Sequence, residues 1–156
     1  MRAAYRVRLV VNLVNGSTLA GLLVAAAGRA RLAGGGDGLL IGDRYRLPRP
    51  PAPAFCLGNV IMTRNERDAL VREEALLAHE ARHATQFAWC AGLVMLPLYF
   101  TSAGVSWVLT GDFGSRNIFE RRAGLTDGGY ADRPLRPALA RWAGRRAPAA
   151  RRRQQA

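Results

Sequence analysis

The chain contains two histidines, His79 and His83, which lie four residues apart with Glu80 between them. On an α-helix, residues at i and i+4 lie on the same face about one turn apart, so this spacing favours a helix. Two imidazoles placed in this way can bind one zinc ion, and the intervening carboxylate can then act on a metal-bound water. The alternative is an ordinary amphipathic helix whose histidines face solvent or pack. We favour the metal site, which constrains the rest of the fold.

A third metal ligand must come from another part of the chain, because a catalytic zinc site has three protein ligands and one open position. No histidine remains, so we expect a carboxylate. Glu120 is the leading candidate, since residues 115–123 are predicted to be helical. Alternatively, Glu120 is a solvated carboxylate that pairs with Arg116 or Arg121. The other candidate ligands lie in glycine-rich surroundings typical of loops: Asp112, Asp127 and Asp132.

Residues 84–111 carry no charged side chain and separate the histidines from Glu120. The segment is long enough to cross a bilayer, but a single crossing would place Glu120 on the opposite side from the histidines. We therefore expect a hairpin of two apolar helices that turns at Pro97 to Ser102, since proline inside a helix removes a backbone donor. The uniform apolarity favours contact with a membrane or an oligomer interface.

Glu80 and Tyr130 are the predicted catalytic residues. Zinc lowers the pKa of its bound water towards 7, and Glu80 would take the proton as the water attacks a carbonyl. The resulting oxyanion needs a donor besides the metal. Tyr130 is one candidate for this donor, with Arg116 and Asn117 as alternatives.

The positive charge of the chain is concentrated at its C-terminus. All 23 basic residues are arginine, and residues 133–156 hold eight of them with no acidic residue. We predict one domain over residues 1–132 and an arginine-rich tail over residues 133–156, with a short helix around Leu135 to Gly144. The tail could contact nucleic acid or anionic lipid headgroups, but a solvated terminus is the expected state. No aromatic stacking platform supports nucleic-acid binding.

The sequence favours a cytoplasmic or inner-membrane-associated protein over a secreted one. Leu9 to Gly28 has the outline of a signal peptide, but polar side chains from Asn12 onward interrupt its apolar run. Cys56 and Cys90 are too few for a disulfide framework and are expected to pack as small hydrophobic side chains. Cys90 also lies about 10 Å along the helix from His83, too far to bind the same metal.

The predicted secondary structure is of the α+β class, with a small sheet before the histidine-bearing helix. The long helix that carries the histidines is expected to begin at Asn65 or Glu66 and to end at Trp89. The elements predicted before it are a strand at Tyr5–Val11, a helix at Thr18–Ala27 capped by Ser17, a hairpin at Leu32–Leu47 and a strand at Phe55–Thr63.

Residues 76–86, Leu-Leu-Ala-His-Glu-Ala-Arg-His-Ala-Thr-Gln, together with the apolar run 55–61, resemble the small bacterial HExxHxxQ domains of the gluzincin class, which include uncharacterised short actinobacterial proteins. The order of an HExxH motif, an apolar segment and a later glutamate also resembles that in membrane-embedded gluzincins. The resemblance implies a minimal zincin-like domain in which His79, His83 and Glu120 bind zinc. Gluzincins commonly carry an aspartate four residues after the ligand glutamate, where this chain has Gly124; Asp127 is the candidate to replace it.

The leading functional hypothesis is a zinc metallopeptidase that hydrolyses peptide or protein substrates, in contact with a membrane surface through residues 84–111 and the tail. The competing hypothesis is a non-catalytic membrane-associated or scaffolding protein with a structural zinc site. An oligomer is compatible with both, because the apolar segment could be covered by a second copy.

Overall fold

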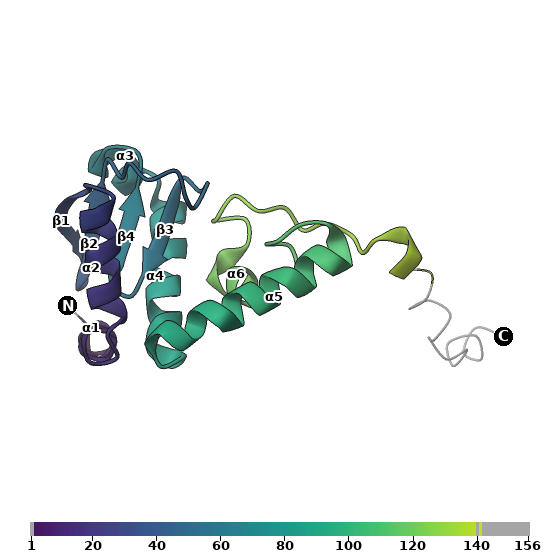
Figure 1. Ribbon diagram of the computed structural model, residues 1–156, viewed down its shortest axis with the longest axis horizontal. Coiled ribbons are helices and arrows are strands. Elements are labelled where there is room, and N and C mark those ends of the chain that lie inside the picture. Colours follow the sequence, from purple (N-terminus) through teal and green to yellow (C-terminus); the bar gives the residue numbers. More distant parts are fainter. Residues whose placement is uncertain (1, 140, 142–156) are drawn as a thin grey trace.

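The computed structural model describes residues 2–139 and 141 and has an α+β fold (Figure 1). It confirms a small sheet followed by helices, with both histidines on one helix and Glu120 on a later one. The elements in chain order are α1 (Ala3–Val14), α2 (Ser17–Ala27), β1 (Arg31–Gly36), β2 (Leu39–Asp43), β3 (Ala54–Leu57), β4 (Val60–Thr63), α3 (Arg67–Arg72), α4 (Glu74–Trp89), the 3-10 helix η1 (Gly92–Val94), α5 (Met95–Thr110) and α6 (Ile118–Gly124).

The sheet has the strand order β1-β2-β4-β3, so β3 lies at one edge. β2 and β4 are parallel, and the two outer pairs are antiparallel. The prediction of one strand over Phe55–Thr63 is wrong, because the chain turns at Gly58 and pairs Cys56 with Ile61. A side chain at Gly58, where φ is +63°, would collide with the backbone of Ser17. The turn therefore lets the sheet and α2 approach closely.

Both faces of the sheet are covered by helices. Ile41 and Ile61 point to the face on which α3 and α4 pack, whereas Val60 and Met62 point to the face covered by α2. Alternating residues of β4 thus serve two separate clusters of buried hydrophobic side chains. This packing fixes α4, and with it the histidines, against the sheet.

The predicted strand at Tyr5–Val11 is a helix, α1. Arg8 and Asn12, one turn apart, are buried, while the apolar side chains of α1 are largely exposed. The Asn12 side-chain amide donates to the carbonyl of Ala84 (2.8 Å) and to Asn59 Oδ1 (3.1 Å). Contacts between distant segments therefore select the helix, and these are invisible in the local pattern.

The predicted helix at Thr18–Ala27 is present as α2, but Ser17 does not cap it. The preceding Asn15 side chain accepts instead from the Ser17 amide at 3.0 Å. The predicted hairpin at Leu32–Leu47 ends earlier, at Asp43, and Gly34 to Gly36 lie within β1, before the turn.

The apolar segment does not form the predicted hairpin, and the loop after α5 returns the chain to the histidines instead. The predicted turn at Pro97–Ser102 is wrong, because both residues lie in the continuous helix α5. Pro97 falls in the first turn of α5, where backbone amides have no partner within the helix, so it is tolerated. The chain turns instead after α4, with Ala91 in the left-handed region (φ 54°). The long predicted helix is likewise divided, into α3 and α4, at Glu73.

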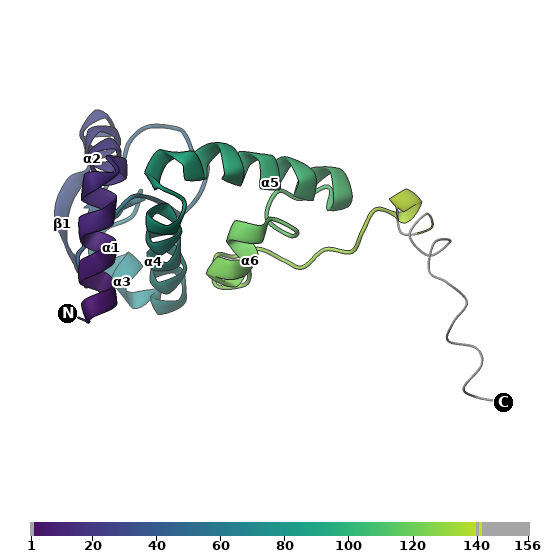
Figure 2. The ribbon, with the colours of Figure 1, turned by 90° about the horizontal axis from the view of Figure 1, so that it is seen from below.

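α5 runs away from the sheet and its helices, with α6 beside it (Figure 2). The helical stretch 92–110 is long and apolar enough to cross a membrane, judged by length and composition only. Its most apolar 18 residues have a mean hydropathy of 1.5, and 22% of them are buried. α1 and α2 reach this length and apolarity only when they are taken together, and the pair is bent by 73°. The predicted tail helix lies partly outside the described residues, but Arg136 at its start stacks on Trp107 of α5, 5.0 Å from the ring centre.

Candidate metal centre

α4 presents His79, Glu80 and His83 as buried side chains. The helix packs its buried Ala84 against the cluster that contains Ile41 and Ile61, and the two histidines lie one turn apart on an adjoining face. Their ring centres are 4.6 Å apart. The HExxH pattern therefore forms one face of a helix, as its spacing predicts.

Glu120 is brought to the histidines by the loop between α5 and α6. Ser106 Oγ of α5 accepts from the amide of Arg116 (2.7 Å), and Ser102 Oγ accepts from the amide of Ile118 (2.9 Å). The Asn117 side chain caps α6 by accepting from the amide of Phe119. α6 consequently begins where its first turn directs Glu120 towards α4, and its carboxylate is 2% exposed.

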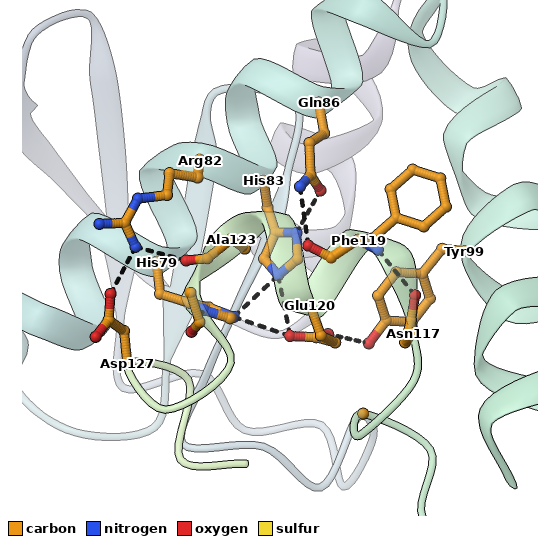
Figure 3. Close-up of polar contacts among 12 residues, drawn as sticks. His79, Arg82, His83, Gln86, Tyr99, Asn117, Phe119, Glu120, Ala123 and Asp127 are labelled. Atoms are coloured by element: carbon orange, nitrogen blue, oxygen red, sulfur yellow. Dashed lines mark hydrogen bonds and ion pairs between the residues drawn. The ribbon is translucent and has the colours of Figure 1, made fainter. Parts of the chain in front are cut away.

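Three potential ligand atoms converge in the interior (Figure 3). His79 Nε2 lies 3.0 Å from His83 Nε2 and 3.1 Å from Glu120 Oε2, and the distance from His83 Nε2 to Glu120 Oε2 is 3.5 Å. This buried group could hold a metal ion. The alternative carboxylates pair with arginines instead: Asp112 with Arg133, Asp127 with Arg82, and Asp132 with Arg116 and Arg121.

The hydrogen bonds of the two imidazoles fix which nitrogen faces the group. His79 Nδ1 is 2.9 Å from the carbonyl oxygen of Gly124, and a carbonyl can only accept, so Nδ1 carries the hydrogen. His83 Nδ1 likewise donates to Gln86 Oε1 at 2.8 Å, since the Gln86 amide nitrogen is committed to the carbonyl of Phe119. When both rings are neutral, the two Nε2 atoms are acceptors that face Glu120 Oε2, which has no hydrogen-bond donor among the described residues. A cation satisfies all three.

The carbonyl of Gly124 orients the His79 ring, a role for which the sequence had suggested Asp127. The Asp127 carboxylate does not contact His79 but pairs with Arg82 (2.7 Å), which also donates to the carbonyl of Ala123. A Cβ at Gly124, where φ is +90°, would collide with the side chains of Asp127 and Arg82. Backbone therefore supplies the acceptor here, and only glycine fits without strain.

Tyr99 of α5 is a site residue that the sequence reasoning missed. Its hydroxyl donates to Glu120 Oε1, which leaves Oε2 directed at the histidines. No specific signal in the sequence pointed to it, because α5 also carries the hydroxyl side chains of Thr101, Ser102, Ser106 and Thr110.

Burial and neighbouring charges set the ionisation of the group. Burial acts to lower the pKa of His79, but contacts with Glu120 and the Gly124 carbonyl outweigh it and raise that pKa. Burial acts to raise the pKa of Glu120, but the two facing imidazoles hold it down to about 2. Glu120 is thus a carboxylate at neutral pH, the form that binds metal.

Glu80 and Tyr130 border the same cavity of about 480 Å³ as the histidines and Glu120. Burial raises the pKa of Glu80 to about 7, and among the described residues its Oε2 has no hydrogen-bond partner. Burial and the nearby Glu120 raise the pKa of Tyr130 to about 12, so its hydroxyl keeps its proton. The alternative oxyanion donors, Arg116 and Asn117, are not among the residues that line this cavity. Arg116 pairs with Asp132, and Asn117 caps α6 through its Oδ1.

Comparison with protein-family models, curated proteins and solved structures gives no match to this chain. The functional interpretation of this chain therefore rests on the geometry of its own residues. The chain contains a buried triad of His79, His83 and Glu120, consistent with an HExxH motif completed by a later glutamate.

Proposed function

We propose that the protein is a zinc-dependent metallopeptidase. The observation that carries this proposal is the convergence of two Nε2 atoms and one carboxylate oxygen at 3.0 to 3.5 Å from one another. Ligands at zinc distances of 2.0–2.2 Å in tetrahedral geometry lie about 3.3 Å apart. Three protein ligands leave one position open, which is the arrangement of catalytic zinc sites rather than structural ones.

Two residues beside the triad could supply the proton transfers of hydrolysis. Zinc bound by the triad would polarise a peptide carbonyl and make a water acidic. Glu80, with a pKa of about 7 and an oxygen free of partners, accepts the proton of the attacking water and returns it to the leaving amine. Tyr130, which remains protonated, donates to the developing oxyanion.

The edge strand β3 supports a peptide as the substrate. β3 is the last strand of the sheet, paired on one side with β4, and its residues Ala54, Phe55 and Cys56 line the cavity beside the triad. An extended peptide can pair with such an edge and so lie across the histidines. A site of this form would hold the substrate through its peptide backbone.

Substitution of Glu80 by glutamine tests the proposal. We expect Glu80→Gln to retain zinc and to lose peptide hydrolysis by at least about 100-fold, because the general base is removed and the ligands are kept. Glu74→Gln, an exposed position on the same helix, serves as the control and should remain active. Zinc retained with no hydrolysis of a diverse peptide library by the wild type would instead support the scaffolding alternative.

We also propose that the protein works at a membrane surface, which its α5 helix contacts. Leu98, Val105 and Val108 lie on one side of α5 and are exposed. No charged residue interrupts residues 84–111, and Arg133 and Arg136 lie at the C-terminal end of α5, where they can meet anionic headgroups. An uncharged face on a helix whose end lies near arginines fits a lipid surface better than a polar partner.

Vesicle flotation tests this location. The wild type should float with vesicles of phosphatidylcholine and phosphatidylglycerol, whereas Leu98→Glu combined with Val105→Glu should not. Val71→Glu, which changes an exposed apolar residue of α3, is the control and should still float. Failure of the wild type to float, with dimers detected by analytical ultracentrifugation, would assign the face to a second copy and overturn the proposal.

A further inference from the structure

The cavity beside the triad is lined mainly by apolar side chains. One wall comes from the proline-rich segment and β3, including Pro53 and Phe55. The opposite wall comes from α5, with Leu96, Phe100 and Ala103, and from Phe113 in the following loop. A volume of about 480 Å³ lies within the range of sites that hold small ligands, so the cavity has room for a large side chain and adjoining backbone.

Charge is restricted to the metal side of this cavity. The chain has 23 arginines, yet among the residues that the structure describes no arginine lines it. The lining carboxylates are Glu80 and Glu120, both next to the histidines. The apolar walls would leave the charge of an aspartate or arginine side chain without a partner, which is costly in a cavity of this kind.

We propose that the site selects extended peptides that place a large, uncharged, apolar side chain, such as leucine or phenylalanine, between β3 and α5. The inference rests on the proposed peptidase function and names its substrate class. Burial of the apolar side chain against Phe55, Leu96 and Ala103 supplies the preference, because it removes apolar surface from water on both sides. Phe100, 67% exposed at the rim, is the residue through which the preference can be changed.

Binding can be measured separately from cleavage. Glu80→Gln protein is titrated with fluorescent hexapeptides that differ only at one central residue, which is phenylalanine, leucine, alanine, aspartate or arginine. We expect the phenylalanine and leucine peptides to bind at least about tenfold more tightly than the alanine peptide, and the charged peptides most weakly. Equal affinity across the series would overturn the inference.

Phe100→Arg, made in the same background, assigns the preference to this wall. A cation at the rim should weaken binding of the phenylalanine peptide and bring the aspartate peptide to equal or higher affinity. Val14→Arg, which adds the same charge to an exposed apolar position of α1, is the matched control and should not change the order. Identical effects of the two substitutions would contradict a role for the α5 wall.

Cleavage of the same peptides by the wild type separates this inference from the proposed function. Apolar preference in binding without cleavage of any peptide would leave the substrate class standing and remove the peptidase function. Cleavage without preference for the apolar peptides would do the reverse.

Discussion

The part of the molecule that ends at Trp89 and the part that follows differ in what holds them in place. The first contains both clusters of buried hydrophobic side chains, one on each face of the sheet. After Trp89, the buried hydrophobic side chains among the described residues are Met95, Ala103 and Ala123. Such a small apolar contribution cannot fix α6 by itself.

Polar contacts with α4 take over this task. The carbonyls of Phe119, Ala123 and Gly124 accept from Gln86, Arg82 and His79, respectively. The two histidines and Glu120 lie among these contacts, with ligands from both parts of the molecule. The comparison teaches that the candidate metal centre also connects the two parts, so we expect metal binding to be thermodynamically linked to the docking of α6.

The strongest contrast concerns the hydrophobic core. Ile61→Ala empties a fully buried position of the central strand and should lower the free energy of unfolding by about 2–5 kcal/mol. Val108→Ala on α5, where the side chain is exposed, should change it by no more than about 0.5 kcal/mol. Denaturant titration followed by circular dichroism measures both. Similar losses from the two substitutions would show that the parts share one core.

Metal removal should destabilise mainly the part of the molecule that follows Trp89. At a zinc concentration 100 times the dissociation constant, binding stabilises the zinc-bound state by about 2.7 kcal/mol. Local opening that releases the metal should therefore become about 100-fold less frequent. Chelation should therefore accelerate hydrogen exchange most in α6, while β4 remains the slower-exchanging segment. Mass spectrometry of exchanged peptides measures this effect, with His83→Ala as the control that should no longer respond to zinc. Unchanged hydrogen exchange in α6 after chelation would show that metal binding does not stabilise the docking of α6 on α4.

Gln86 connects the two parts through a single side chain. Gln86→Ala removes the acceptor of His83 Nδ1 and the donor to the Phe119 carbonyl, so zinc affinity should fall about 10–100-fold. Competition with a chromogenic chelator measures it. Thr85→Ala is the neighbouring control, because the Thr85 hydroxyl donates to the Ala81 carbonyl of its own helix. Equal affinities for both variants would remove Gln86 from the site.

Tyr99 should give the smallest effect. Tyr99→Phe removes one hydrogen bond to Glu120 Oε1 and leaves the ring packing intact, so zinc affinity should fall by less than about tenfold. The same chelator competition detects it, and a crystal structure of the variant should show a rotated carboxylate. An unchanged affinity with an unmoved carboxylate would show that the hydroxyl does not position Glu120.

The site was predictable where its chemistry depends on residue type and local spacing. His79 and His83 need only a helix to share a face, and Glu120 was found because few other ligand types remained. The structure brings these three together, and their role as zinc ligands remains a prediction. The carbonyl of Gly124 could not be predicted, since a backbone acceptor leaves no mark in the residue type.

The fold was predictable to the level of its class and its central helix. The strand expected at Tyr5–Val11 is a helix because Asn12 bonds to Asn59 and Ala84, residues far along the chain. The turn expected at Pro97 lies earlier, because a proline in the first turn of a helix costs no backbone hydrogen bond. In both cases tertiary context outweighs a local signal.

Elemental mass spectrometry of the purified protein tests the central claim most directly. We expect about one zinc per chain in the wild type, lost in His83→Ala and in Glu120→Ala. Asp132→Ala, which removes a carboxylate that pairs with arginines instead, should retain it. Absence of zinc from the wild type after zinc is supplied, or its retention in Glu120→Ala, would contradict a metal centre that joins the two parts of the molecule.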